Sequence, residues 1–158
     1  MPRGKLTEEQ VRAFAEEHLN YEYQMLLATA VELSNPGLVQ HIKNSLLESF
    51  TIHLRALIDF IWEAQKLRED DAVASDFFSS PDKWFQVQPN FPAALEPARS
   101  RTGKEVAHLT YTRLDVTADA KRWHIVDMAN ALTAALVVFA KNADPACLGD
   151  ALAALKKA

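Results

Sequence analysis

The run VQHIKNSLLESFTIHLRALIDFI, residues 39–61, decides the fold class of this chain. Its apolar side chains recur every three or four residues, which is the spacing that places them on one face of an α-helix. Strand signals are almost absent from the rest of the chain, so the sequence predicts an all-α protein. The stripe on this helix comprises Val39, Ile42, Leu46, Phe50, Leu54, Leu57, Phe60 and Ile61.

Capping residues set the predicted boundaries of the first two helices. Thr7 and Gln10 have the spacing of a capping box, which opens a first helix that we expect to end near Leu33. Asn35 is expected to cap the second helix, with Pro36 at its first position, and this helix should run to about residue 67.

Three further helices are expected towards the C-terminus. Pro97 should begin a third helix that ends near Leu114, and Thr117 should cap a fourth that ends near Asn142. A short fifth helix is expected from Asp144 onwards. The predicted fold is therefore an antiparallel four-helix bundle with a short fifth C-terminal helix, formed as one domain over residues 1–158.

One long loop, about residues 68–92, is expected to be ordered. Loops of this length in compact domains are either functional or packed as lids. Five aromatic side chains would anchor this loop to the helices: Phe77, Phe78, Trp84, Phe85 and Phe91.

The composition excludes several classes of protein. Of 158 residues, 49% are hydrophobic and only four are glycine, which is typical of a globular chain rather than a disordered or fibrous one. The single cysteine, Cys147, excludes an internal disulfide framework. No apolar leader is visible, and the apolar run at 134–140 is far below the roughly 18 residues of a membrane span. We therefore expect a cytoplasmic protein with no membrane partner and no cofactor.

Several polar residues lie where an apolar stripe or a solvated face is expected. His18, four residues before Glu22, falls within the stripe of the first helix, and His53 falls within that of the second. A histidine in such a place is usually satisfied by one hydrogen bond to a carboxylate or carbonyl. Arg55 and Asp59 lie opposite the second stripe and form either an exposed ion pair or a docking point for the aromatic loop or a second subunit.

The segment 101–113 carries the strongest functional pattern. Helical spacing places Arg101, Glu105, His108 and Thr112 along one side, where a structural helix usually carries apolar residues. The net charge of the chain is −4, but residues 99–122 hold six basic and three acidic side chains. An arginine and a histidine on one face are suited to phosphate binding and proton transfer.

This segment resembles a known motif. Arg101-Thr-Gly-Lys-Glu-Val-Ala-His108 is similar to the arginine, four to six residues, histidine motif of the HEPN superfamily, a group of small all-helical bundles. The amino-acid sequences of residues 53–60, 70–78 and 108–113 also resemble those of uncharacterised helical bacterial proteins of that general kind. Many members of the superfamily are metal-independent ribonucleases, with the motif lining a cleft at a dimer interface.

The resemblance implies roles for individual residues. His108 would act as general base or general acid on RNA, and Arg101 would hold the phosphate and stabilise the transition state. Lys104 and Arg113 would add phosphate contacts. A homodimer is implied, and the protein would be an RNA-directed ribonuclease or a catalytically inactive relative.

Two other interpretations remain open. The protein could be a non-catalytic helical module for dimerisation or for binding a protein partner, in which the histidines satisfy one another. Alternatively, His18, His53 and His108, one from each of three helices, could hold a metal ion, because neutral imidazoles suit zinc or nickel. The sequence does not decide whether the protein is an enzyme.

Overall fold

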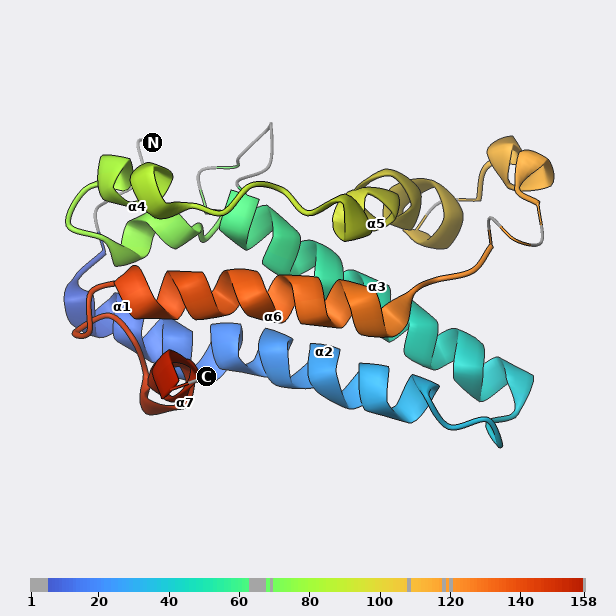
Figure 1. The fold of residues 1–158 in the computed structure, drawn as a ribbon, viewed down its shortest axis with the longest axis horizontal. Coiled ribbons are helices and arrows are strands. Elements are labelled where there is room, and N and C mark those ends of the chain that lie inside the picture. Colours follow the sequence, from blue (N-terminus) through green and yellow to red (C-terminus); the bar gives the residue numbers. More distant parts are fainter. Residues whose placement is uncertain are drawn as a thin grey trace.

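The computed structural model describes residues 6–62, 68, 70–107, 109–117, 119 and 121–157. Within these ranges every regular element is helical, which confirms the prediction of an all-α protein. The chain runs along one long helix, returns along a second, passes back through a segment of short helices and returns along a third long helix (Figure 1). Of the four long helices that the sequence predicts, the third, from Pro97, therefore lies within the segment of short helices.

The first long helix consists of α1 (Glu8–Phe14), a π-helical stretch (Ala15–Leu19) and α2 (Asn20–Leu33). The predicted capping box is present. The Gln10 backbone N–H donates to Thr7 Oγ1 at 3.2 Å, and the Thr7 N–H donates to Gln10 Oε1 at 2.9 Å. Both predicted ends of this helix are confirmed.

The π-helical stretch decides which residues of this helix face the core. Val11, Ala15, Leu19 and Tyr23 are spaced by four and are all buried. Four residues advance a regular α-helix by about 40° beyond a full turn, so such a row would drift around the helix. The wider π turn removes this drift and turns His18 to the solvent. The prediction that His18 lies in the apolar stripe is therefore wrong.

The second long helix, α3 (Gln40–Trp62), begins later than predicted. The Asn35 carboxamide oxygen does accept the Gly37 N–H at 2.9 Å, but this bond closes a separate turn. Gly37 favours such a break because glycine is a poor helix former. Of the predicted stripe, Val39 and Ile42 are exposed, since the first turns of α3 extend beyond the start of the third long helix (Figure 1).

The segment of short helices occupies residues 74–107. It contains a 3₁₀ turn (Ala74–Phe77), α4 (Pro81–Val87), a second 3₁₀ turn (Ala93–Leu95), α5 (Glu96–Arg101) and a π-helical stretch (Thr102–Ala107). The helix predicted from Pro97 to Leu114 ends at Ala107 among the described residues, and a 3₁₀ turn follows at Tyr111–Asp115.

The third long helix, α6 (Ile125–Asn142), begins well after the predicted cap at Thr117. Two contacts hold the preceding backbone outside the helix. The Arg122 carbonyl accepts a hydrogen bond from Arg101 Nη1 at 3.1 Å, and the Trp123 ring lies under the Arg101 guanidinium. The C-terminal helix α7 (Asp150–Ala153), continued by a 3₁₀ turn (Ala154–Lys157), also begins later than the predicted start at Asp144.

α6 is long and apolar enough to cross a membrane by length and composition alone, with 18 residues of mean hydropathy 1.3. The uninterrupted apolar run at 134–140 is shorter because Thr133 and Lys141 lie on either side of it. One face of α6 is buried against α2 and α3, through Met128, Leu132, Leu136 and Phe139. The core helix of a soluble protein meets the same criterion.

An aromatic cluster joins the predicted ordered loop to the core. The Phe139 ring lies 5.2 Å from those of Phe60 and Phe77, and 5.9 Å from that of Trp84. Trp84 is fully buried and its indole N–H donates to the Ile61 carbonyl at 3.3 Å. Ala74, Phe77 and Trp84 of this loop are therefore part of the core, and the loop is packed in place rather than a movable lid.

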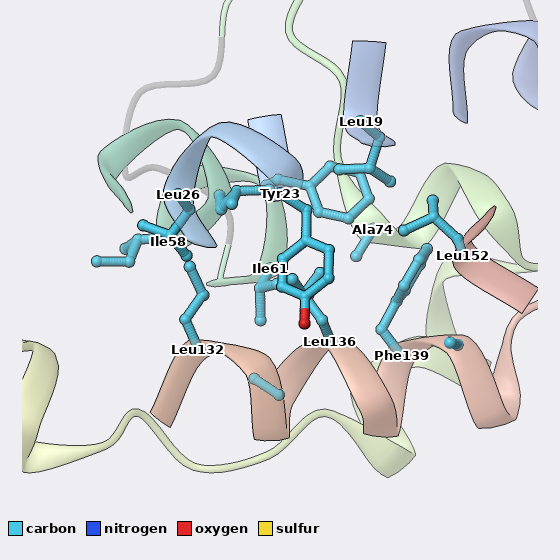
Figure 2. Packing of buried hydrophobic residues seen from close by; sticks show 14 of the residues in the cluster. Leu19, Tyr23, Leu26, Ile58, Ile61, Ala74, Leu132, Leu136, Phe139 and Leu152 are labelled. Carbon is cyan, nitrogen blue, oxygen red and sulfur yellow. The ribbon is translucent and has the colours of Figure 1, made fainter. Parts of the chain in front are cut away.

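Around the middle of the molecule, the core is formed by the three long helices. Figure 2 shows Tyr23 and Leu26 from α2, Ile58 and Ile61 from α3, and Leu132, Leu136 and Phe139 from α6 converging on one another. The Tyr23 ring is buried, and its hydroxyl donates a hydrogen bond to Thr133 Oγ1 at 3.4 Å.

Candidate functional site

A cleft of about 290 Å³ lies between the first half of α3, the α5 region and the chain that precedes α6. Five charged side chains line it: Glu48, Arg101, Glu105, Arg113 and Lys121. The remaining lining comes from Asn44, Leu47, Val106, Val116 and Trp123. Residues far apart in the sequence thus meet in one concave site that combines charged and apolar side chains.

Arg101 is fixed within this cleft by three groups. Its Nε and Nη2 donate to the two carboxylate oxygens of Glu105, both at 2.8 Å, and Nη1 donates to the Arg122 carbonyl. Its guanidinium carbon also lies 4.2 Å from the centre of the Trp123 ring, which is a cation–π contact. The Arg101 and Glu105 side chains are only 16% and 19% exposed, so solvent weakens this pair little.

The local sequence explains why the helix holds Arg101 in this position. Thr102 is buried and its hydroxyl donates to the Ala98 carbonyl at 2.8 Å. A Cβ atom at Gly103 would lie 3.3 Å from Arg55 Nη1, so the absence of a side chain lets this segment approach α3 closely. Threonine and glycine are mediocre and poor helix formers, and here the burial of Thr102 and the close approach at Gly103 offset that cost.

The arrangement limits what Arg101 can do. A guanidinium has five N–H donors, and three of them are already engaged by Glu105 and the Arg122 carbonyl. A phosphate would have to compete with the Glu105 carboxylate for the planar edge that binds two oxygens at once. Arg101 therefore acts first as a structural tie between α5 and the chain before α6.

Only part of the predicted site can be placed. Arg101, Glu105 and Arg113 line the same cleft. His108 and the side chains of Lys104 and Thr112 lie outside the described residues. Lys121 and Trp123 line the cleft without having been predicted as site residues. Lys121 belonged to the basic stretch 99–122, whereas no sequence signal indicated Trp123.

His53 lies away from this cleft, between α2 and α3. It is 8% exposed, its Nδ1 lies 2.7 Å from Glu22 Oε2, and the Tyr21 ring meets it edge-on at 5.7 Å. Glu22 thus pairs with His53 of the neighbouring helix rather than with His18 of its own. This is the ordinary satisfaction of a core histidine by one carboxylate.

Arg55 and Asp59 form a half-exposed pair, with 3.6 Å between Nε and Oδ2. The α5 region, rather than the aromatic loop, packs against Arg55. Burial raises the pKa of the Asp59 carboxyl, and the Arg55 and Arg99 guanidinium groups offset part of that rise. The aromatic loop docks instead on Trp62, whose indole N–H donates to the Pro89 carbonyl at 2.8 Å.

The histidine metal site has little support from the residues that can be placed. His18 is exposed beside the Phe14 ring, whereas His53 is buried against Glu22. His108, the third candidate ligand, lies outside the described residues. Among the residues with described positions, no group of three or more histidine, cysteine, aspartate or glutamate side chains is placed to hold a metal ion.

Comparison with known proteins adds no further constraint. No protein-family model matches the chain, and neither does a curated protein or a solved structure. The resemblance to the HEPN superfamily therefore rests on the sequence motif alone, and the functional interpretation rests on the cleft.

Proposed function

We propose that the protein binds RNA and holds a phosphate group in the cleft beside Arg101 without cleaving the RNA. The observation that carries this proposal is the convergence of Arg113 and Lys121 on one cleft that also contains the Arg101–Glu105 pair and the Trp123 indole. Sites that bind single-stranded nucleic acid usually combine cationic side chains with aromatic rings.

The charges of the cleft favour one bound anion. Among the described residues, three cations and two carboxylates line it, which gives that part of the lining a net charge of +1. Arg101 and Glu105 neutralise each other through two short hydrogen bonds. The other charged side chains among the described lining residues are Arg113, Lys121 and Glu48. A phosphate between these cations would gain charge-assisted hydrogen bonds.

The two hydrogen bonds that hold Arg101 to Glu105 favour binding over catalysis. A catalytic arginine must turn its planar edge towards the phosphate as charge develops in the transition state. Here Glu105 occupies that edge. The ribonuclease alternative requires His108 as proton donor or acceptor and a released Arg101. The homodimer and the cytoplasmic location stay predictions of the sequence.

Replacing Lys121 with glutamine is expected to weaken binding of a short single-stranded RNA by about fivefold, through loss of one phosphate contact. The slope of log affinity against log salt concentration should fall by about one unit. Fluorescence anisotropy of labelled RNA at several salt concentrations measures both quantities.

Lys141→Gln is the matched control. It removes the same charge from the exposed C-terminal end of α6, at the other end of the molecule from the cleft (Figure 1). Its affinity and salt slope should stay close to those of the wild type. Equal losses in the two variants would show that only overall charge matters, and the cleft would then not be the binding site.

A further inference from the structure

A second concave surface adjoins the cleft at the 3₁₀ turn Tyr111–Asp115. Residues 109–111, 113 and 114 line it, and its volume is about 450 Å³. Leu109, Tyr111 and Leu114 are 93%, 91% and 83% exposed, the highest values among the exposed large hydrophobic residues of the described chain. Exposing three bulky apolar side chains to water within six residues is unfavourable. A ligand that covers them would remove this apolar surface from water.

The two surfaces share one side chain. Arg113 lines the charged cleft and also lines the apolar pocket of the turn. A ligand that fills both must therefore carry an anionic group next to a flat or apolar body. A nucleotide has this composition, since its phosphate and its base are joined through one sugar.

We propose that the turn at 109–114 binds the unpaired base of one nucleotide, whose phosphate lies in the Arg101 cleft. This inference rests on the proposed function and names the form of RNA that the cleft accepts. The Tyr111 ring supplies a face on which a base stacks, and Leu109 and Leu114 supply apolar contact at its edges. Bases inside a duplex are stacked on one another and cannot reach such a pocket.

An exposed Leu–Tyr–Leu surface is also what a protein interface shows. The shared Arg113 favours RNA, because it places a positive charge where the apolar turn meets the charged cleft, which matches a base joined to a phosphate. RNA binding and a protein interface predict different effects of the same variants, so one set of variants distinguishes them.

The test compares three RNAs of the same length: a single strand, a duplex, and a single strand with abasic positions. The wild type should bind the single strand more tightly than the duplex or the abasic strand. Tyr111→Ser should lower affinity for the single strand by about tenfold and leave affinity for the abasic strand unchanged. Phe85→Ser, an exposed aromatic residue in α4, is the matched control and should change none of these affinities.

Three outcomes would overturn the inference, and they separate it from the proposed function. If the three RNAs bind with equal affinity and Lys121→Gln still weakens binding, the base pocket is wrong and the phosphate cleft stands. If no RNA binds, both proposals are wrong. If sedimentation shows that Tyr111→Ser abolishes self-association while RNA affinity is unchanged, the turn is a protein interface.

Discussion

Replacing Phe139 with alanine is expected to lower the free energy of unfolding by about 3–5 kcal/mol, the usual cost of deleting a buried phenylalanine side chain. The Phe139 ring is fully buried and contacts the rings of Phe60, Phe77, Phe78 and Trp84. These four rings come from α3 and from the loop, whereas Phe139 lies in α6. The cavity left by Phe139 would therefore loosen three segments together.

Chemical denaturation followed by circular dichroism measures this loss. Phe85→Ala is the control, since Phe85 is 50% exposed and its removal should change the unfolding free energy by about 0.5 kcal/mol or less. A loss below about 1 kcal/mol for Phe139→Ala would show that the aromatic cluster does not join the loop to the core.

Arg101→Ala is expected to cost the second largest amount, about 2–4 kcal/mol of unfolding free energy. The variant leaves the Glu105 carboxylate, 19% exposed, without its cation and removes the contacts to Trp123 and to the Arg122 carbonyl. The loss should appear in thermal and chemical denaturation in the absence of any ligand.

A double-mutant cycle separates the ion pair from the rest of this effect. Arg101→Leu with Glu105→Leu should be more stable than Arg101→Leu alone, because no carboxylate is then left unpaired in the cleft. If the loss of the double variant equals the sum of the losses of the two single variants, the two side chains do not interact. The proposed role of Glu105 in holding Arg101 would then be wrong.

The sequence predicts the helical class and some boundaries because those depend on local signals. The capping box at Thr7 satisfies backbone groups within four residues, so it forms as predicted. Asn35 carries the same kind of signal, but Gly37 follows it and the turn closes early. The start of α6 depends on contacts from Arg101, twenty-one residues away from Arg122, and no local pattern reports these.

The candidate site is predictable to a similar extent. The spacing of Arg101 and Glu105 by four residues is a standard ion-pair signal, and the pair forms. The sequence does not show that Trp123 and the Arg122 carbonyl also contact Arg101, because these residues lie about twenty positions further along the chain. The exposed position of His18 follows from the π-helical stretch, which shifts the helix face away from the regular projection.

The central claim is that the cleft binds RNA and leaves it intact. Incubating the wild type with labelled single-stranded RNA in the presence of a chelator tests it most directly, with anisotropy and gel analysis on the same sample. We predict a rise in anisotropy that Lys121→Gln weakens, while the RNA stays at full length. RNA fragments that appear despite the chelator and disappear in His108→Ala would contradict the claim and establish a ribonuclease.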